Sequence, residues 1–538
     1  MVLLLGDGLG DTARSLVFTG GLAMVAFLVS FLACTTSVPE IPAGNATMPD
    51  VIMVSIDTLR ADHLSSYGHD RPTSPFLDSL ATEGVRFEHA RSNSPWTLPA
   101  HLTMLTGQLP VTHQVTDDHL ALSSSVEVLP EAMQKAGYAT GASVATLYVS
   151  RKFGFDRGFD FFDDHDIKTE KENLRGSVIA EDILEAAAEW METLPEGKPA
   201  FLFLHFYDVH YHYDPPPPFD TMFDRAPSKG DRRFRNYYSH KKKPLTETQK
   251  AHQLAQYDES IAYVDAQLKA FYELLDKAGR KQRWVVTSDH GEEFGERGSW
   301  GHAHTLYAEQ LRVPLIISGE GLPKNKVLAK AVGIHDIAPT ISGWVQQPMS
   351  SVDGIDLNPA MNGTPLPDRA FPAETFRFKT RRISLYEDGK RIEWDVRRNK
   401  KELFATDTDL LETTNLASSD KEGVKKLAAR AEEVFGRPWI ATQNGELEVE
   451  KGVVLRNGPS KKKTVKQGDE FQVLPYDAAM SFKATGAVDA VGPWRSTAPP
   501  PEGSALNYRS EARTDGISLD EATRKQLEQL GYIQGSDE

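Results

Sequence analysis

Val51-Ile-Met-Val-Ser-Ile-Asp57 is the stretch that decides the fold. Its run of apolar, mostly β-branched residues predicts a strand that is buried on both faces, which is typical of parallel sheets covered by helices. Asp57 follows the last apolar residue, so its carboxylate is expected at the carboxyl end of the strand. Open α/β sheets place their functional sites at this edge.

Two later apolar runs also end in polar side chains. Phe201–His205 predicts a strand that ends in histidine, and Arg283–Ser288 predicts a strand followed by Asp289-His290-Gly291. Strand patterns alternate with helical patterns from residue 50 to about residue 348, which predicts a mainly parallel sheet flanked by helices. The longest predicted helix covers Thr246–Ala278.

The pattern changes towards the C-terminus. Ile383–Val396 predicts an antiparallel hairpin with a turn at 387–389, and a helix is predicted at 421–435. Beyond these we expect an irregular segment with one short strand near Glu470–Val473, and a final helix at 519–531. The expected domains are a signal peptide at 1–34, a linker at 35–49, a catalytic domain at 50–350, an antiparallel sheet and helix subdomain at 351–438, and an irregular extension at 439–538.

Thr97-Leu-Pro-Ala-His-Leu-Thr-Met-Leu-Thr-Gly107 predicts a helix with a hydroxyl group at its start. Pro99 suits the first turn and Gly107 suits the C-terminal stop, so Thr97 is expected to be the N-cap. A helix N-terminus presents unpaired N–H groups and a partial positive charge, which favour an anionic ester. Taken alone, Thr97 would be interpreted as a helix cap; the motifs on other segments favour a role as nucleophile.

Oxygen and nitrogen ligands for a divalent ion are spread over three of these segments. Asp57, the Thr97 oxygen, Asp289 and His290 together form a plausible site for Zn²⁺, Mn²⁺ or a related ion such as Ca²⁺. A threonine hydroxyl can attack a phosphorus or sulfur centre once a metal lowers its pKa.

In this order and spacing, the segments resemble the sulfatase family of the alkaline phosphatase superfamily over about residues 50–435. The sulfatase signature begins with Cys or Ser, continues with x-Pro-x-Arg and closes with Leu-Thr-Gly. Here Thr97 stands at the nucleophile position and His101 at the arginine position. Thr58 stands where the family usually has a second Asp ligand. Further similarity lies at 73–87, 311–317 and 403–416.

The resemblance implies an alkaline-phosphatase-like α/β fold, with a mainly parallel sheet sandwiched by helices and a small C-terminal antiparallel sheet subdomain. It also implies a divalent metal ion and an anionic ester substrate. The expected catalytic residues are Thr97, His210 and His302; the expected substrate-binding residues are Arg60, His101 and His304; and the expected metal ligands are Asp57, Thr97, Asp289 and His290.

The number of metal ions, one or two, stays open at this point. The two-zinc phosphodiesterases of the superfamily need an additional Asp and two additional His for their second ion. Residues that could furnish these ligands are Asp208, His212, His302 and His304. His205 is compatible either with a ligand or with a histidine that is hydrogen-bonded within the core.

Threonine at the nucleophile position favours phosphate over sulfate esters. Sulfatases mature Cys or Ser to an aldehyde, formylglycine, whose hydrate expels sulfate by eliminating through its second hydroxyl; threonine cannot supply that aldehyde. An intermediate on Thr97 must be cleaved by activated water, which metal-assisted phosphoryl transfer does readily. We therefore expect a hydrolase of phosphate mono- or diesters, with sulfate esters as the other substrate class. A phosphoryl head-group transferase and a non-catalytic binding protein on a sulfatase fold are the alternatives.

Composition and the N-terminal segment indicate location and partners. The 538 residues carry 60 basic and 76 acidic side chains, a net charge of −16, which argues against nucleic acid as the main partner. Residues 16–33 are a long apolar stretch, and Phe31-Leu-Ala-Cys34 resembles a bacterial lipobox. We expect a signal peptide and a lipid-modified Cys34 that anchors the secreted catalytic domain to the lipid bilayer of the cell envelope. An uncleaved signal anchor is the alternative.

Overall fold

The computed structural model describes residues 40–115, 122–164, 178–224, 245–377, 380, 382–396 and 398–435, and the backbone of short strands between 437 and 507. The expected signal peptide, the lipobox at Cys34 and the final helix at 519–531 lie outside the described residues, so they stay predictions. Within the described part of the chain, no helix is both long and apolar enough to span a membrane.

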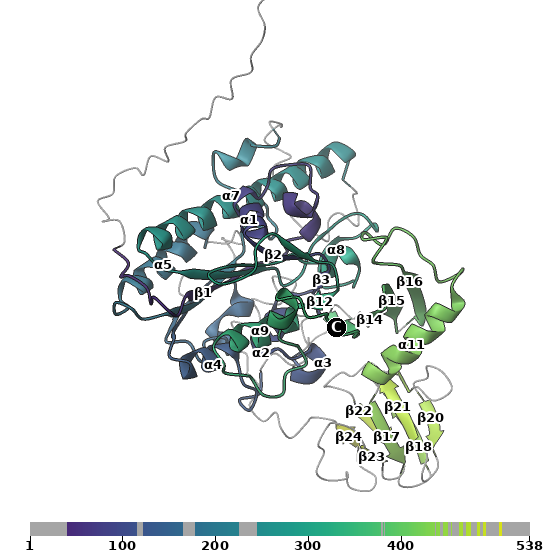
Figure 1. Ribbon diagram of the computed structural model, residues 1–538. Helices are drawn as coiled ribbons and strands as arrows, with labels where there is room; N and C mark the ends of the chain where they lie inside the picture. Colours follow the sequence, from purple (N-terminus) through teal and green to yellow (C-terminus); the bar gives the residue numbers. More distant parts are fainter. Residues whose placement is uncertain are drawn as a thin grey trace, which may run out of the picture. The chain divides into compact units, whose positions relative to one another are not determined.

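An eight-stranded sheet carries the elements of the predicted site (Figure 1). Strand β1 (Asp50–Ile56) pairs in parallel with β6 (Ala200–Phe206) on one side and with β7 (Gln282–Thr287) on the other. Strand β10 (Leu315–Gly319) runs antiparallel to its two neighbours, β7 and β2 (Gly84–Phe87). The order is β11-β2-β10-β7-β1-β6-β4-β5, in which the remaining, parallel strands are β4 (Ala139–Val144), β5 (Phe161–Asp163) and β11 (Lys326–Leu328). The prediction of a mainly parallel sheet is confirmed.

Helices cover both faces of this sheet because the residues of β1 alternate between the faces. Val51 and Met53 belong to one apolar cluster, and Ile52 and Val54 belong to the other. Each fully buried apolar side chain of this size contributes roughly 1.5–3 kcal/mol. The helices in the first cluster are α2 (Thr97–Thr106), α4 (Leu129–Lys135) and α9 (Ile337–Trp344), and those in the second are α1 (Pro75–Thr82), α5 (Ala180–Glu192) and α7 (Glu247–Lys277) (Figure 1).

Shorter elements lie in the connections between these strands and helices. They are β3 (Ala90–Arg91), β8 (Glu293–Phe294), β9 (Trp300–Gly301), β12 (Val332–Gly333), α3 (Pro110–His113), α8 (Ala308–Leu311) and α10 (Asn358–Met361). Short 3-10 helices are η1 (Ala61–His63), η2 (Ser65–Tyr67), η3 (Leu147–Val149), η4 (Arg151–Phe153), η5 (Phe219–Thr221) and η6 (Ile334–Asp336).

The 31-residue helix α7 begins and ends where the sequence predicts. The Thr246 hydroxyl caps it by accepting a hydrogen bond of 3.2 Å from the backbone N–H of Gln249. Gly279 follows its end with a φ of 70°, a left-handed conformation that glycine adopts without steric cost. The middle of α7 brings Tyr257 to the loop after β1, where its hydroxyl donates to the Thr58 carbonyl at 2.7 Å.

Helix α2 ends as predicted, but its first residue is Thr97, which the sequence predicts to be the N-cap before the helix. Gly107 follows the last helical residue with a φ of 67°. At the other end, Trp96 is the N-cap and Thr97 is the first helical residue, so the prediction that Thr97 is the N-cap is wrong. The extended backbone of Trp96 provides the entry to the helix, and the Thr97 hydroxyl points to Asp57 and not to the backbone of its own helix.

A four-stranded antiparallel sheet follows the central sheet in the chain. Its β14–β15 hairpin is the one predicted at 383–396, and α11 (Lys421–Phe435) packs against it through an apolar cluster. The predicted small C-terminal antiparallel sheet is therefore confirmed. Its strands are β13 (Phe371–Thr375), β14 (Arg382–Glu387), β15 (Lys390–Asp395) and β16 (Lys400–Phe404).

Short strands also occupy 437–507, where the sequence predicts an irregular segment, so that prediction is wrong. The strand predicted near Glu470–Val473 corresponds to β21 (Glu470–Leu474). The others are two to five residues long, too short for an alternating pattern to stand out. Two antiparallel sheets, β19-β21-β17-β23 and β20-β18-β22-β24, contain β17 (Arg437–Ala441), β18 (Gly445–Val449), β19 (Val453–Val454), β20 (Lys462–Val465), β22 (Ser481–Ala484), β23 (Val488–Ala490) and β24 (Ala505–Asn507).

A buried ion pair joins the amino ends of the central strands. Nε and Nη2 of Arg280 donate to the two carboxylate oxygens of Asp50 at 2.5 and 2.8 Å, and both side chains are buried. Asp50 also accepts a hydrogen bond of 2.8 Å from the backbone N–H of Ala200, and Arg280 donates to the Lys198 carbonyl at 2.9 Å. The pair thus contacts the starts of β1 and β6 and the segment before β7.

We expect Arg280→Met to lower the free energy of unfolding by about 3–5 kcal/mol, because the Asp50 carboxylate would stay buried without its partner. Denaturant unfolding followed by circular dichroism measures this. Lys281→Met is the matched control, since the neighbouring Lys281 pairs with Glu320 on the surface and its loss should leave stability nearly unchanged. Equal destabilisation by the two substitutions would contradict the role given to the buried pair.

Candidate active site

Side chains from three neighbouring strands meet at the carboxyl edge of the sheet. Asp57 directly follows β1, His205 lies near the end of β6, and Asp289 and His290 follow β7 within three residues. Because the three strands are adjacent, parallel and in register, their ends lie level with one another. The sheet therefore assembles the residues that the sequence predicts to share a site.

Asp57, Asp289 and His290 form a group of fully buried metal-ligand side chains. Their ligand atoms lie within 4.8 Å of one another, with His290 Nε2 3.2 Å from Asp289 Oδ2 and 3.9 Å from Asp57 Oδ1. These three atoms are buried without a hydrogen-bond partner. Burial raises the pKa of Asp57 to about 6 and also raises the pKa of Asp289. The group fits a divalent cation, which would offset the cost of burying both carboxylates.

Hydrogen bonds from the surrounding backbone orient these ligands. His290 Nδ1 lies 2.9 Å from the Gly291 carbonyl, which turns Nε2 towards the carboxylates. Asp289 Oδ1 accepts from the backbone N–H groups of His290 and Thr58 at 2.9 and 3.3 Å, so Oδ2 is the oxygen left for a cation. Thr58 donates its own hydroxyl to the Val209 carbonyl at 3.0 Å and does not join the ligand group.

Thr97 Oγ1 lies 3.4 Å from Asp57 Oδ2 at the start of α2. His101, one turn later, is fully buried beneath it: His101 Nδ1 lies 2.8 Å from the Thr97 carbonyl, and Nε2 lies 2.9 Å from Ser55 Oγ. Burial lowers the pKa of His101 to about 3, so the ring is neutral. Both nitrogens of His101 are hydrogen-bonded inside the protein, so the ring supports Thr97; its contact with substrate stays a prediction.

His210 and His302 form a row with the ligand His290. The centroid of the His302 ring lies 4.5 Å from that of His290 and 4.9 Å from that of His210. His302 Nδ1 lies 3.0 Å from Glu292 Oε1. His210 packs against the rings of Tyr207 and Tyr211, with its Nε2 3.1 Å from the Tyr207 hydroxyl and its Nδ1 2.8 Å from the Tyr211 carbonyl. Burial lowers the pKa of both histidines well below the usual range, so both are neutral. The structure brings both predicted catalytic histidines to the ligand group.

Two predicted substrate-binding residues have carboxylate partners of their own. Arg60 buries its guanidinium in ion pairs with Asp62, at 2.7 Å, and with Glu296. His304 Nε2 lies 3.3 Å from Glu293 Oε2. These contacts give Arg60 and His304 supporting positions in the loops around the site, and their contact with substrate stays a prediction.

The extra ligands of a second catalytic ion are not assembled in the described part of the chain. Asp208 and His212 belong to neither of the two groups of metal-type ligands found there. Asp208 Oδ1 accepts instead a hydrogen bond of 3.2 Å from the backbone N–H of Ala180, at the start of α5. His302 Nδ1 is bonded to Glu292. The number of catalytic ions, one or two, stays a prediction.

His205 is the site residue that the sequence alone leaves without an assigned role. Its Nε2 lies 3.3 Å from Asp57 Oδ2, and its ring centroid lies 4.8 Å from that of His101. Burial lowers the pKa of His205 to about 4, so a neutral imidazole faces the carboxylate. Its position in the sequence could have identified it, because the apolar run of β6 ends in this histidine and therefore at the same sheet edge as Asp57.

Known proteins are similar to this chain in both sequence and fold. The family model described as Sulfatase matches residues 49–347. A choline-sulfatase of Rhizobium meliloti is 22% identical over 438 aligned residues, covering 71% of this chain and 85% of that protein. A low-salt glycan biosynthesis sulfotransferase of Haloferax volcanii is 42% identical over 96 residues, covering 16% of this chain and 24% of that protein.

Among solved structures, the phosphonate monoester hydrolase of Agrobacterium radiobacter is similar with a TM-score of 0.59 and 18% identity, covering 72% of this chain and 95% of that one. At this identity the similarity shows the fold alone. The region matched by the family model includes β1, α2, β6 and β7, which are the elements that position the site.

We expect Asp289→Ala to remove one equivalent of divalent metal per chain, because the Asp289 Oδ2 atom faces the proposed ion. Elemental analysis of purified, dialysed protein measures the content. Asp208→Asn is the control, since the Asp208 side chain bonds the start of α5, and it should retain the metal content of the parent. Loss of an equivalent in Asp208→Asn would favour the two-ion alternative.

Proposed function

This chain belongs to the sulfatase family, and on that premise we propose that it is a metal-dependent hydrolase of phosphate-type esters with the Thr97 hydroxyl as its nucleophile. As a family member it is an ester hydrolase of the alkaline phosphatase superfamily. The proposal assigns the nucleophile, the metal ligands and the preferred class of ester.

The position of the Thr97 hydroxyl is the observation that carries this proposal. Thr97 Oγ1 lies 3.4 Å from Asp57 Oδ2, and the other oxygen of that carboxylate is one of the three buried ligand atoms that have no hydrogen-bond partner. It also lies in the first turn of α2, where the helix dipole favours an anionic group. Because oxidation of threonine cannot yield the aldehyde of formylglycine, the hydroxyl itself is the group available for attack.

Asp57, Asp289 and His290 would hold the ion, with the Thr97 oxygen as a further ligand. Zinc, manganese and calcium all accept carboxylate oxygens, and zinc and manganese also accept imidazole nitrogen readily. When bound, the ion supplies a positive charge that lowers the pKa of an alcohol and balances the charge on the ester oxygens.

In the first proposed step, Thr97 Oγ1 attacks phosphorus and the bond from phosphorus to the leaving oxygen breaks. Asp57 Oδ2 accepts the hydrogen bond of the Thr97 hydroxyl and orients the attacking oxygen. The one proton that the Thr97 hydroxyl gives up balances the one that the leaving oxygen takes up. We assign His302, a neutral imidazole, to a hydrogen bond with the leaving oxygen. We assign His210 to the ester oxygens, for which its Nε2 would exchange the Tyr207 hydroxyl. In the second step, water attacks the phosphothreonine, the bond to Thr97 breaks, and the Thr97 hydroxyl regains its proton.

The chemistry of the second step favours phosphate-type esters over sulfate esters. A formylglycine hydrate releases sulfate through its second hydroxyl, whereas Thr97 has a single hydroxyl, so its ester must be cleaved by water. Metal-assisted attack of water on a phosphoryl group is a common reaction. Because the chain has sulfatase relatives, sulfate esters are the competing substrate class. Phosphonate monoesters are a further class to test, because a protein of similar fold is named a phosphonate monoester hydrolase.

Transfer to an acceptor is the second candidate function. It is favoured by the 96-residue match to a protein named a glycan sulfotransferase. The first step would be unchanged, and an alcohol would replace water in the attack on the group carried by Thr97. Product analysis in the presence of added alcohols separates the two, because hydrolysis releases free anion and transfer releases a new ester.

We expect Thr97→Val to reduce hydrolysis of aryl phosphate and phosphonate esters by on the order of 10³-fold or more, since it removes the nucleophile and keeps the side-chain shape. Turnover of aryl phosphate monoester, phosphodiester, phosphonate monoester and sulfate ester is compared for metal-loaded protein. Mass spectrometry of the acid-quenched reaction should detect a phosphate group on Thr97.

Thr97→Ser is the control for this prediction. It retains a hydroxyl at the same position, so unmodified Thr97→Ser protein should keep phosphate-ester turnover within about tenfold of the parent, or 1.4 kcal/mol in activation free energy. Sulfate ester as the best substrate, or full activity in Thr97→Val, would contradict the threonine mechanism.

A further inference from the structure

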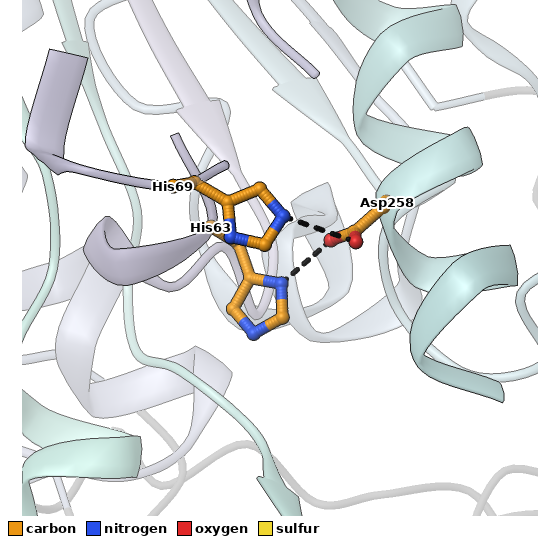
Figure 2. A group of neighbouring side chains, drawn as sticks. All are labelled: His63, His69 and Asp258. Carbon is orange, nitrogen blue, oxygen red and sulfur yellow. Dashed lines mark hydrogen bonds and ion pairs between the residues drawn. The ribbon is translucent and has the colours of Figure 1, made fainter. Parts of the chain in front are cut away.

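A second group of metal-type ligands lies outside the active site, and we propose that it binds a structural zinc ion. The group consists of His63, His69 and Asp258 (Figure 2). His63 ends the short helix η1, His69 follows η2 by two residues, and Asp258 lies in the middle of α7. None of the three belongs to the catalytic machinery described above.

Both imidazole rings point at the same carboxylate, as Figure 2 shows. His63 Nδ1 lies 2.6 Å from Asp258 Oδ1, and His69 Nε2 lies 3.1 Å from Asp258 Oδ2. The two rings are stacked, with centroids 4.9 Å apart and an interplanar angle of 30°. The three ligand atoms lie within 4.8 Å of one another, although the histidines are 189 and 195 residues away from the aspartate in the chain.

Two histidine nitrogens and one carboxylate oxygen are a ligand set that zinc accepts, with water as the fourth ligand. Bonds of about 2.0–2.2 Å to a tetrahedral ion place the ligand atoms about 3.3–3.6 Å apart. With Asp258 Oδ2 as the carboxylate ligand, the distance from His69 Nε2 to Oδ2, now 3.1 Å, needs to lengthen by a few tenths of an ångström. His63 Nδ1, now 2.6 Å from Oδ1 of the same carboxylate, would turn from that oxygen to the ion. The ion would replace the hydrogens that bridge these contacts, and each ring would keep one proton on its other nitrogen.

His69 is the most exposed of the three side chains in the group. The Asp258 side chain is 1% exposed, whereas the His69 side chain is 19% exposed and offers the entry for the ion and its water. The Thr73 hydroxyl donates to the His63 carbonyl at 2.6 Å and holds the segment in place. Arg71 donates to Asp258 Oδ2 at 2.7 Å, but its side chain is 37% exposed and can turn into solvent when zinc takes that oxygen.

An ion at this position would brace the loop that carries Asp57. Tyr257, next to Asp258 on α7, donates its hydroxyl to the Thr58 carbonyl at 2.7 Å and accepts the backbone N–H of Arg60 at 2.8 Å. His63 packs edge-on against the Tyr257 ring, with centroids 4.9 Å apart. Zinc bound between η1, η2 and α7 would therefore fix this loop through Tyr257.

The test is the zinc content of the full chain after chelation and reloading with Zn²⁺. We expect His69→Gln to hold one equivalent fewer than the parent, because glutamine keeps a donor for Asp258 but is a poor zinc ligand. His252→Gln is the matched control: His252 also lies on α7 and pairs with a carboxylate, with its Nδ1 2.8 Å from Asp224 Oδ2, and it should keep the parent content. Equal zinc content in His69→Gln and the parent would overturn the proposal.

The variant Asp289→Ala distinguishes the zinc bound by His63, His69 and Asp258 from the proposed catalytic ion. The losses should be additive, so that Asp289→Ala with His69→Gln holds two equivalents fewer than the parent. Circular dichroism of zinc-free His69→Gln checks that the variant is folded. If it is unfolded, X-ray absorption of zinc-loaded Asp289→Ala decides: zinc with two imidazole ligands supports the proposal, and protein without bound zinc overturns it. The zinc content and the zinc ligands can both be measured without knowing which ester the enzyme cleaves.

Discussion

Parallel pairing of β1 with β6 and β7 is the constraint on which the site depends. Parallel strands end at the same sheet edge, so one register sets the heights of Asp57, His205 and Asp289 together. A slip of one residue would also exchange the two faces of β1 and move Val51 from the α2 side to the α7 side. The apolar clusters on both faces therefore enforce the same register that assembles the ligands. At the opposite edge, the buried pair of Asp50 and Arg280 joins the same strands.

Buried negative charge at the carboxyl edge determines what the site can bind. Asp57 and Asp289 are fully buried, and burial raises the pKa of both carboxyl groups. The neighbouring His101 and His205 are kept neutral by the same burial, so these rings do not balance the carboxylate charge. A divalent cation does so directly, because the buried atoms without hydrogen-bond partners are the ones that face one another.

Two positions of helix α2 depart from the sulfatase signature. Thr97 replaces Cys or Ser, and His101 replaces the arginine of the signature. The His101 ring fills its place by bonding both Ser55 and the Thr97 carbonyl, which ties α2 to β1. A charged arginine is thus exchanged for a neutral support, and the hydroxyl that we propose as the nucleophile lies beside Asp57.

The sequence by itself determined the elements whose signals are local. The apolar runs of β1, β6 and β7, the Thr246 cap and Gly279 stop of α7, and the hairpin at 383–396 all follow from periodicity and from cap or turn residues within a few positions. Asp57, Asp289 and His290 could be named as candidate ligands because a strand end is itself a local feature. Only the tertiary structure decided which side chains meet. His205 reaches Asp57 across 148 residues, and His63 reaches Asp258 across 195. Arg60 is held by Glu296, 236 residues away. Such pairings depend on how helices and strands pack in space, and no local pattern of residues specifies them.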